Sequence, residues 1–293
     1  MSTAVVLHNI SKKFGKPGLR RRSWHLGAGS RMTGGPAFGR SMGGVVVLER
    51  VSFQVEAGEI FGVLGAPGSG KSSLIRILAT LIRPDEGEAR IFGYDIVRQP
   101  LQVQRWINRV SVEASFFKQL SPIENLISGR RGDGTRGDGS RLQAEELLAR
   151  LGIDAQTAGR PMESLNRNMQ QKVSIARALF SRPRLLLLDE PMRGLDGQSR
   201  CAVHQVIGEL RSAQGTTVLL TSQDFIEGHN EMHNEIHSLC DRVVTLEGGR
   251  VSAPFAPDKS DSDALANQNL AVQIPAGIEW IEELQQSSRD GSS

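Results

Sequence analysis

Residues 65–72 read Gly65-Ala66-Pro67-Gly68-Ser69-Gly70-Lys71-Ser72, which fits the pattern GxxxxGK[ST] at every fixed position. An apolar run, Ile60–Leu64, precedes this stretch, and apolar residues at helical spacing follow it over Lys71–Ile82. Between a strand and a helix, such a loop directs backbone N–H groups and the helix N-terminus at phosphate. We predict that Gly65–Ser73 binds phosphate, with Lys71 neutralising the β- and γ-phosphates and Ser72 holding Mg²⁺; Ser73 completes the loop. The alternative is an ordinary glycine-rich turn.

A second apolar run, Leu185–Leu188, leads into Asp189 and Glu190. A continuous apolar run is typical of a parallel strand that is buried on both faces. Because the carboxyl ends of parallel strands face the ligand crevice, we predict that Asp189 joins the Mg²⁺ shell and that Glu190 orients or deprotonates water. The alternative is a solvated strand end before a proline turn.

The rest of the chain alternates predicted strands with predicted helices, which indicates an α/β fold with a largely parallel sheet. The further strands are predicted at Ala4–Lys12, Val45–Val55, Glu88–Phe92, Thr216–Thr221, Arg242–Glu247 and Gly249–Val251. Helices are predicted at Gln198–Ala213 and Ile226–Leu239, and a helical region at Ser121–Phe180, broken by a loop over Gly129–Ser140.

The composition is that of a globular protein: 293 residues, 39% hydrophobic and 23% charged. No apolar run approaches the roughly 18 residues needed to cross a bilayer, so we expect no membrane span. The first residues lack the features of a secretory signal, and the two cysteines, Cys201 and Cys240, fit a reducing cytosol. We therefore expect a cytoplasmic protein.

Positive charge is concentrated near the N-terminus. Residues 1–50 hold nine Lys and Arg side chains and one acid, Glu49. Arg20–Arg22 beside Trp24 could contact nucleic acid or anionic lipid. The alternative, which we favour, is a solvated Gly/Arg-rich insertion over residues 16–44.

Taken together, these motifs resemble the ATP-binding subunits of ABC transporters, over most of residues 2–251. The resemblance lies in Gly65–Ser72, Gln170–Pro191, Gly194–Asp196 and Cys240–Val251. It implies a P-loop NTPase core, a small antiparallel β subdomain and a helical subdomain at about residues 115–180, followed by a polar tail over 252–293. It also implies ATP and Mg²⁺ as ligands, a second nucleotide-binding subunit that closes head-to-tail on two ATP molecules, and a membrane subunit that this closure drives.

Family roles carry over to individual residues. Phe14 matches the aromatic residue that stacks on adenine, although a strand-end core aromatic is the alternative. Asp196 matches the acid of a turn at the dimer interface. Leu165–Met169 stands at the signature segment without the family's serine and glycines, which would contact the partner's γ-phosphate. Asn166 and Asn168 are the candidate nucleotide-binding residues here: Asn166 can still donate hydrogen bonds, but Asn168 has a side chain where the backbone would need to approach closely.

Two further positions depart from the family. Val112, with Glu113 beside it, stands where a glutamine is usual, and Gln223 stands where a histidine is usual. A glutamine can donate a hydrogen bond to the γ-phosphate but cannot carry a proton. His229, His233 and His237 follow at helical spacing; they could bind zinc or replace the histidine, but we favour an exposed polar face.

The sequence thus predicts an ATP-hydrolysing subunit that powers a separate membrane subunit, with a lean to export, on the inner face of the membrane. Two alternatives remain open. One is a hydrolysis-poor nucleotide switch or the weak half of an asymmetric pair, which the departures favour. The other is a soluble nucleic-acid-associated ATPase, for which the basic insertion is the only hint.

Overall fold

The computed structural model describes residues 2–15, 44–111, 116–129, 138–223 and 238–256. Some predictions lie outside these residues: the insertion up to residue 43, Val112 and Glu113, the tail from residue 257, and most of the predicted helix at 226–239, with His229, His233 and His237.

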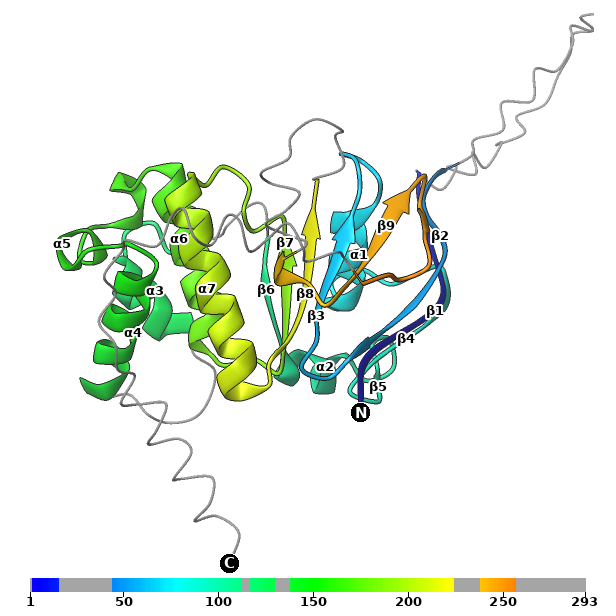
Figure 1. Ribbon diagram of the computed structural model, residues 1–293, viewed down its shortest axis with the longest axis horizontal. Helices are drawn as coiled ribbons and strands as arrows, with labels where there is room; N and C mark the ends of the chain where they lie inside the picture. Colours follow the sequence, from blue (N-terminus) through cyan, green and yellow to red (C-terminus); the bar gives the residue numbers. More distant parts are fainter. Residues whose placement is uncertain (1, 16–43, 112–115, 130–137, 224–237, 257–293) are drawn as a thin grey trace, which may run out of the picture.

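A six-stranded, mostly parallel sheet forms the centre of the molecule, in the order β10-β9-β3-β8-β7-β6 (Figure 1). Its strands are β3 (Ile60–Leu64), β6 (Ile107–Val110), β7 (Leu185–Asp189), β8 (Thr217–Ser222), β9 (Arg242–Glu247) and β10 (Arg250–Val251). Neighbouring strands run parallel except for the β9–β10 hairpin. Every residue of β3, β7 and β8 is buried, as their apolar runs predict. The α/β prediction is confirmed.

A second sheet of four antiparallel strands packs beside the first, in the order β2-β1-β4-β5. It consists of β1 (Thr3–Phe14), β2 (Val45–Glu56), β4 (Glu86–Ile91) and β5 (Tyr94–Asp95). Helix α1 (Lys71–Leu78) shares one apolar core with both sheets. The rings of Phe53 in β2 and Phe61 in β3 stack with centroids 5.0 Å apart. The small antiparallel sheet thus fixes one side of the loop that opens α1.

Helices gather on the other side of the central sheet (Figure 1). They are α3 (Pro122–Gly129), α4 (Asp138–Arg150), α5 (Ala155–Ala158), the 3₁₀ turn at Met162–Ser164, α6 (Arg167–Phe180) and α7 (Gly197–Gln214). They share a second apolar core with one face of the central sheet. No described helix combines the length and apolar character needed to cross a membrane.

Two element predictions need correction, and further observed elements have no counterpart among the predictions. Helix α1 ends at Leu78 rather than Ile82, because Thr80 adopts a left-handed φ of 60° that breaks the helical backbone. Helix α4 begins at Asp138, inside the predicted loop, where polar residues form a first helical turn. Helix α2 (Pro100–Trp106) and strand β6 are not among the predicted elements.

Candidate functional site

The loop between β3 and α1 is built around glycines that no other residue can replace without strain. Gly70, the residue before α1, has a φ of 112°, and a Cβ there would lie 2.6 Å from the carbonyl oxygen of Val47. A Cβ on Gly65 would lie 2.4 Å from the carbonyl oxygen of Leu246. The loop is therefore wedged between β2 and β9, and its shape is fixed before any ligand binds.

The substitution Gly70→Ala is expected to lower the free energy of unfolding by about 1–3 kcal/mol and to weaken phosphate binding, because it adds both a strained φ and a collision with Val47. Chemical denaturation and ATP titration would measure the two effects. Gly93→Ala is the matched control: its φ of 83° is also left-handed, but an added Cβ meets nothing within 4 Å. Equal behaviour of the two variants would contradict this account of the loop.

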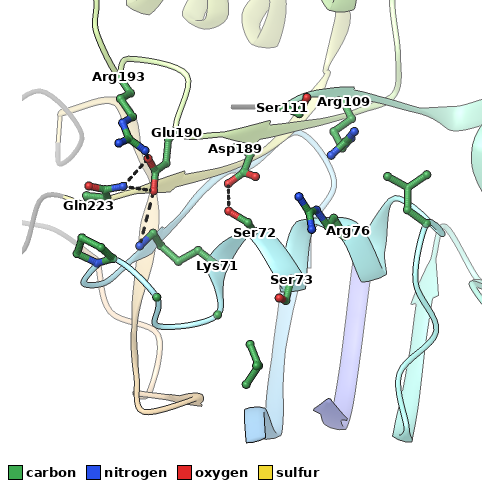
Figure 2. A pocket seen from close by; sticks show the side chains of 15 residues that line it. Lys71, Ser72, Ser73, Arg76, Arg109, Ser111, Asp189, Glu190, Arg193 and Gln223 are labelled. Atoms are coloured by element: carbon green, nitrogen blue, oxygen red, sulfur yellow. Dashed lines mark hydrogen bonds and ion pairs between the residues drawn. The ribbon is translucent and has the colours of Figure 1, made fainter. Parts of the chain in front are cut away.

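Lys71 is buried inside this loop, with its side chain 3% exposed. Its Nζ donates hydrogen bonds to the carbonyl oxygens of Gly65 and Ala66, at 2.6 and 2.9 Å, and lies 3.9 Å from Oε1 of Glu190. The ammonium group thus lies in the wall of the cavity, within reach of an anion bound by the loop (Figure 2).

Asp189, at the end of β7, is joined to two hydroxyl groups. Its Oδ1 accepts a hydrogen bond from Ser72 Oγ at 3.0 Å (Figure 2). The same oxygen accepts a second hydrogen bond, from Thr221 Oγ1, at 3.1 Å. Burial raises the pKa of Asp189, and the bonds from Ser72 and Thr221 lower it in part. Carboxylate and hydroxyl oxygens are hard donors that suit Mg²⁺, so this pair fits the metal that the sequence predicts.

Glu190 has a constrained backbone and a fully engaged carboxylate. Its φ is 50°, in the left-handed region, and its N–H donates to Thr221 Oγ1 at 3.1 Å. Gln223 Nε2 lies 2.6 Å from both carboxylate oxygens, and Arg193 Nη1 donates to Oε2 at 3.1 Å (Figure 2). Gln223, which follows β8, and Arg193, in the turn after β7, thus hold the carboxylate in the cavity.

These residues line one cavity of about 680 Å³. Pro67, Gly68, Gly70, Lys71, Ser72, Ser73, Asp189, Glu190 and Gln223, all predicted from the sequence, are among its lining residues. Three arginines that sequence reasoning missed, Arg76, Arg109 and Arg193, also line it. Burial lowers the pKa of Arg109, whereas the charge of Asp189 raises it. The cationic wall suits a polyanionic ligand.

Sequence signals existed for two of these arginines. Arg76 lies four residues after Ser72 in α1, so both side chains share one face of the helix. Arg193 lies three residues after Glu190, which places it in the same turn. Arg109 lies on β6, whose sequence, INRV, carries no clear strand pattern, so nothing in the sequence placed it here.

Seven predicted residues are absent from the cavity lining. Three of them, Gly65, Ala66 and Ser69, belong to the phosphate loop itself, and the other four lie elsewhere. Phe14 ends β1 and is 42% exposed, with Lys12 Nζ 5.5 Å from the centroid of its ring, so it is not a core aromatic. Asn166 caps α6 by accepting from the N–H of Met169 at 2.9 Å. Asn168 donates to Asp196 Oδ2 at 2.5 Å.

Asp196 in turn caps α7, where its carboxylate accepts from the N–H and hydroxyl of Ser199. These hydrogen bonds lower the pKa of Asp196 to about 2. Asn166, Asn168 and Asp196 therefore belong to a separate surface, formed by the starts of α6 and α7.

Comparison with known proteins points to one family. A family model described as "ABC transporter" matches residues 48–193. A daunorubicin/doxorubicin resistance ATP-binding protein of Streptomyces peucetius is 37% identical over 210 residues, which cover 72% of this chain and 61% of that relative. The daunorubicin resistance ATP-binding protein DrrA3 of Streptomyces coeruleorubidus is 33% identical over 230 residues, which cover 78% of this chain and 70% of the relative.

Solved structures share the fold. A dimeric ATP-binding cassette in a post-hydrolysis state, bound to ADP and Pi, superposes with a TM-score of 0.68 at 24% sequence identity. The alignment covers 87% of this chain and 99% of that cassette. The two sheets and the helical layer are therefore arranged as in that cassette.

Proposed function

The chain belongs to the ABC transporter family, as one of its ATP-binding proteins, and we propose that it binds and hydrolyses ATP to power a separate membrane subunit. One observation carries the proposal: Lys71, Ser72, Asp189 and Glu190 converge on a single cavity between the phosphate loop and the ends of β7 and β8. The matched region of the chain spans less than two thirds of the first of these relatives, so the activity is proposed from this site rather than carried over.

The residues divide the chemistry between them. The loop from Gly65 to Ser73 and the Lys71 ammonium bind the phosphates, and Ser72 and Asp189 would hold Mg²⁺, which neutralises phosphate charge when bound. Glu190 takes a proton from a water molecule while the oxygen of that water attacks the γ-phosphorus. The bond between the γ-phosphorus and the oxygen that bridges to the β-phosphate breaks. The products are ADP and inorganic phosphate. Gln223 can donate a hydrogen bond to the γ-phosphate in place of the usual histidine.

Substitution of Asp189 tests the metal site. We expect Asp189→Asn to keep the hydrogen bond to Ser72 within reach while removing the charge that Mg²⁺ requires. ATP binding should then lose its dependence on Mg²⁺, and turnover should fall about 10²-fold or more. ATP titrations with and without EDTA would measure the Mg²⁺ dependence of binding, and phosphate release would measure turnover. Asp154→Asn, at the exposed start of α5, is the control. Unchanged Mg²⁺ dependence in Asp189→Asn would place the metal elsewhere.

The surface formed by the starts of α6 and α7 is the candidate contact with a second subunit. We propose that Asn166, Asn168 and Asp196 face the ATP of a second nucleotide-binding subunit, and that Phe14 stacks on the adenine of the chain's own ATP. The exposure of Phe14, Asn166 and Asp196 supports this assignment, because all three residues lie at the surface, where a ligand or a partner subunit can reach them. Light scattering with Mg²⁺-ATP would test the second subunit. Dimers of the wild-type chain, and monomers of Lys71→Ala, would support it.

We further propose that transport runs outward from the inner face of the membrane. The two relatives are named for resistance to daunorubicin, and removal of a small toxic molecule from the cell is a direct route to resistance. The membrane partner would be a separate subunit.

A hydrolysis-poor nucleotide switch, or the weak half of an asymmetric pair, is the second candidate. Two contacts favour it. The Asn168 side chain is bonded to Asp196, and Gln223 Nε2 lies within hydrogen-bond distance of both oxygens of Glu190. Tight Mg²⁺-ATP binding without turnover would select this candidate over the first.

A further inference from the structure

Arg193 makes a contact with Glu190 that the proposed mechanism leaves unused. The two residues belong to one turn, in which the N–H of Arg193 donates to the carbonyl oxygen of Glu190 at 3.2 Å. Their side chains also form an ion pair, with Arg193 Nη1 3.1 Å from Glu190 Oε2. Gln223 and Lys71 approach the same carboxylate. Its lone pairs are therefore committed to protein donors, and a carboxylate in that state is a poor acceptor for a proton from water.

Arg193 is the donor in this group that is most free to leave. Its side chain is 61% exposed, whereas the side chain of Glu190 is 8% exposed and that of Lys71 is 3% exposed. Glu190 cannot follow it, because its N–H is bonded to Thr221 and its backbone is held at a left-handed φ. A change of rotamer can thus separate the guanidinium from the carboxylate without moving either backbone.

A triphosphate would compete for this guanidinium. Arg193 lines the same cavity as Lys71 and Ser72, so a nucleotide seated there presents several negative charges to it, against the single charge of Glu190. Guanidinium groups bind phosphate oxygens in paired hydrogen bonds, which favours the phosphate further. Glu190 itself is repelled by the same phosphates.

We propose that Arg193 has two partners in turn: it binds the Glu190 carboxylate while the cavity is empty, and it binds the terminal phosphate when a nucleoside triphosphate enters. This inference rests on the proposed function, in which Glu190 is the base. The transfer frees carboxylate lone pairs only when a third phosphate is present. A nucleoside diphosphate, which lacks that phosphate, leaves Arg193 on Glu190.

The test compares binding of Mg²⁺-β,γ-imido-ATP and Mg²⁺-ADP, measured by calorimetry, in the wild-type chain and in Arg193→Met and Arg193→Lys. For Arg193→Met we expect the Kd for the ATP analogue to rise about tenfold and the Kd for ADP to change less than about twofold. Arg193→Lys should restore most of the affinity for the analogue, because it keeps the charge. In turnover, kcat should fall more than KM rises, because the contact with the phosphate strengthens as charge develops there.

Arg105→Met is the matched control, since Arg105 is exposed on α2 and is absent from the cavity lining. Equal loss of affinity for both nucleotides, no loss for either, or no rescue by lysine would overturn the proposal. Because the binding comparison needs no turnover, it is separate from the proposed function. A wild-type chain that binds the analogue but does not hydrolyse ATP contradicts the activity, and the comparison of the two nucleotides still decides whether Arg193 contacts the third phosphate.

Discussion

Replacement of Lys71 with alanine is expected to abolish ATP binding at ordinary concentrations. The ammonium group is buried, and it is the cation that the fold holds between the loop carbonyl groups and Glu190. Loss of the Lys71 ammonium removes positive charge from the phosphate site and leaves the Glu190 carboxylate without this buried cation. Truncation of one member of a buried charged pair commonly costs about 2–5 kcal/mol, which corresponds to a Kd for Mg²⁺-ATP raised about 30-fold to several thousand-fold.

Calorimetric titration would measure this change, and thermal unfolding would check that the variant folds. Lys118→Ala removes a lysine from an exposed turn and should bind Mg²⁺-ATP like the wild-type chain. A folded Lys71→Ala variant with wild-type affinity would mean that the cavity is not the phosphate site.

Replacement of Glu190 with glutamine is expected to separate binding from hydrolysis. Glutamine has the same shape, but its amide cannot take the proton of the attacking water. Loss of a general base lowers turnover by about 10²- to 10⁴-fold. Binding should hold or tighten, because a negative charge 3.9 Å from Lys71 is removed from a cavity that accepts a polyanion.

Steady-state phosphate release and ATP titration on the same preparation would measure both effects. Glu163→Gln, an exposed acid near the helical layer, serves as the control and should leave turnover unchanged. If Glu190→Gln retains turnover, another group accepts the proton and the role assigned to Glu190 is wrong.

The phosphate loop could be predicted from sequence because its chemistry is local. Residues 65–72 are contiguous and join β3 directly to α1, so the motif can be recognised from local sequence alone. The close approach of β2 and β9 to Gly70 and Gly65 is seen only in the fold. Asp189 and Glu190 could be predicted because an apolar run places them at a strand end. The pairing of β7 with β8, in which Asp189 lies opposite Thr221, then brings them to the loop.

Contacts that depend on distant segments could not be predicted. Gln223 reaches Glu190 from the end of β8 across 33 positions of sequence, and its role could be predicted only through family resemblance. Arg109 enters the cavity from β6, a short edge strand with two polar residues, which no periodicity marks. The apolar spacing alone predicts too long a helix at α1, because that spacing continues past Thr80, where the left-handed φ turns the backbone.

The central claim is that this cavity both binds and hydrolyses ATP, and steady-state hydrolysis of Mg²⁺-ATP by the purified chain, beside Glu190→Gln, tests it most directly. We predict saturable turnover in the wild-type chain, lost with EDTA and in the variant, while both proteins bind ATP. Saturable binding with wild-type turnover no higher than that of Glu190→Gln would contradict the claim and leave a nucleotide switch.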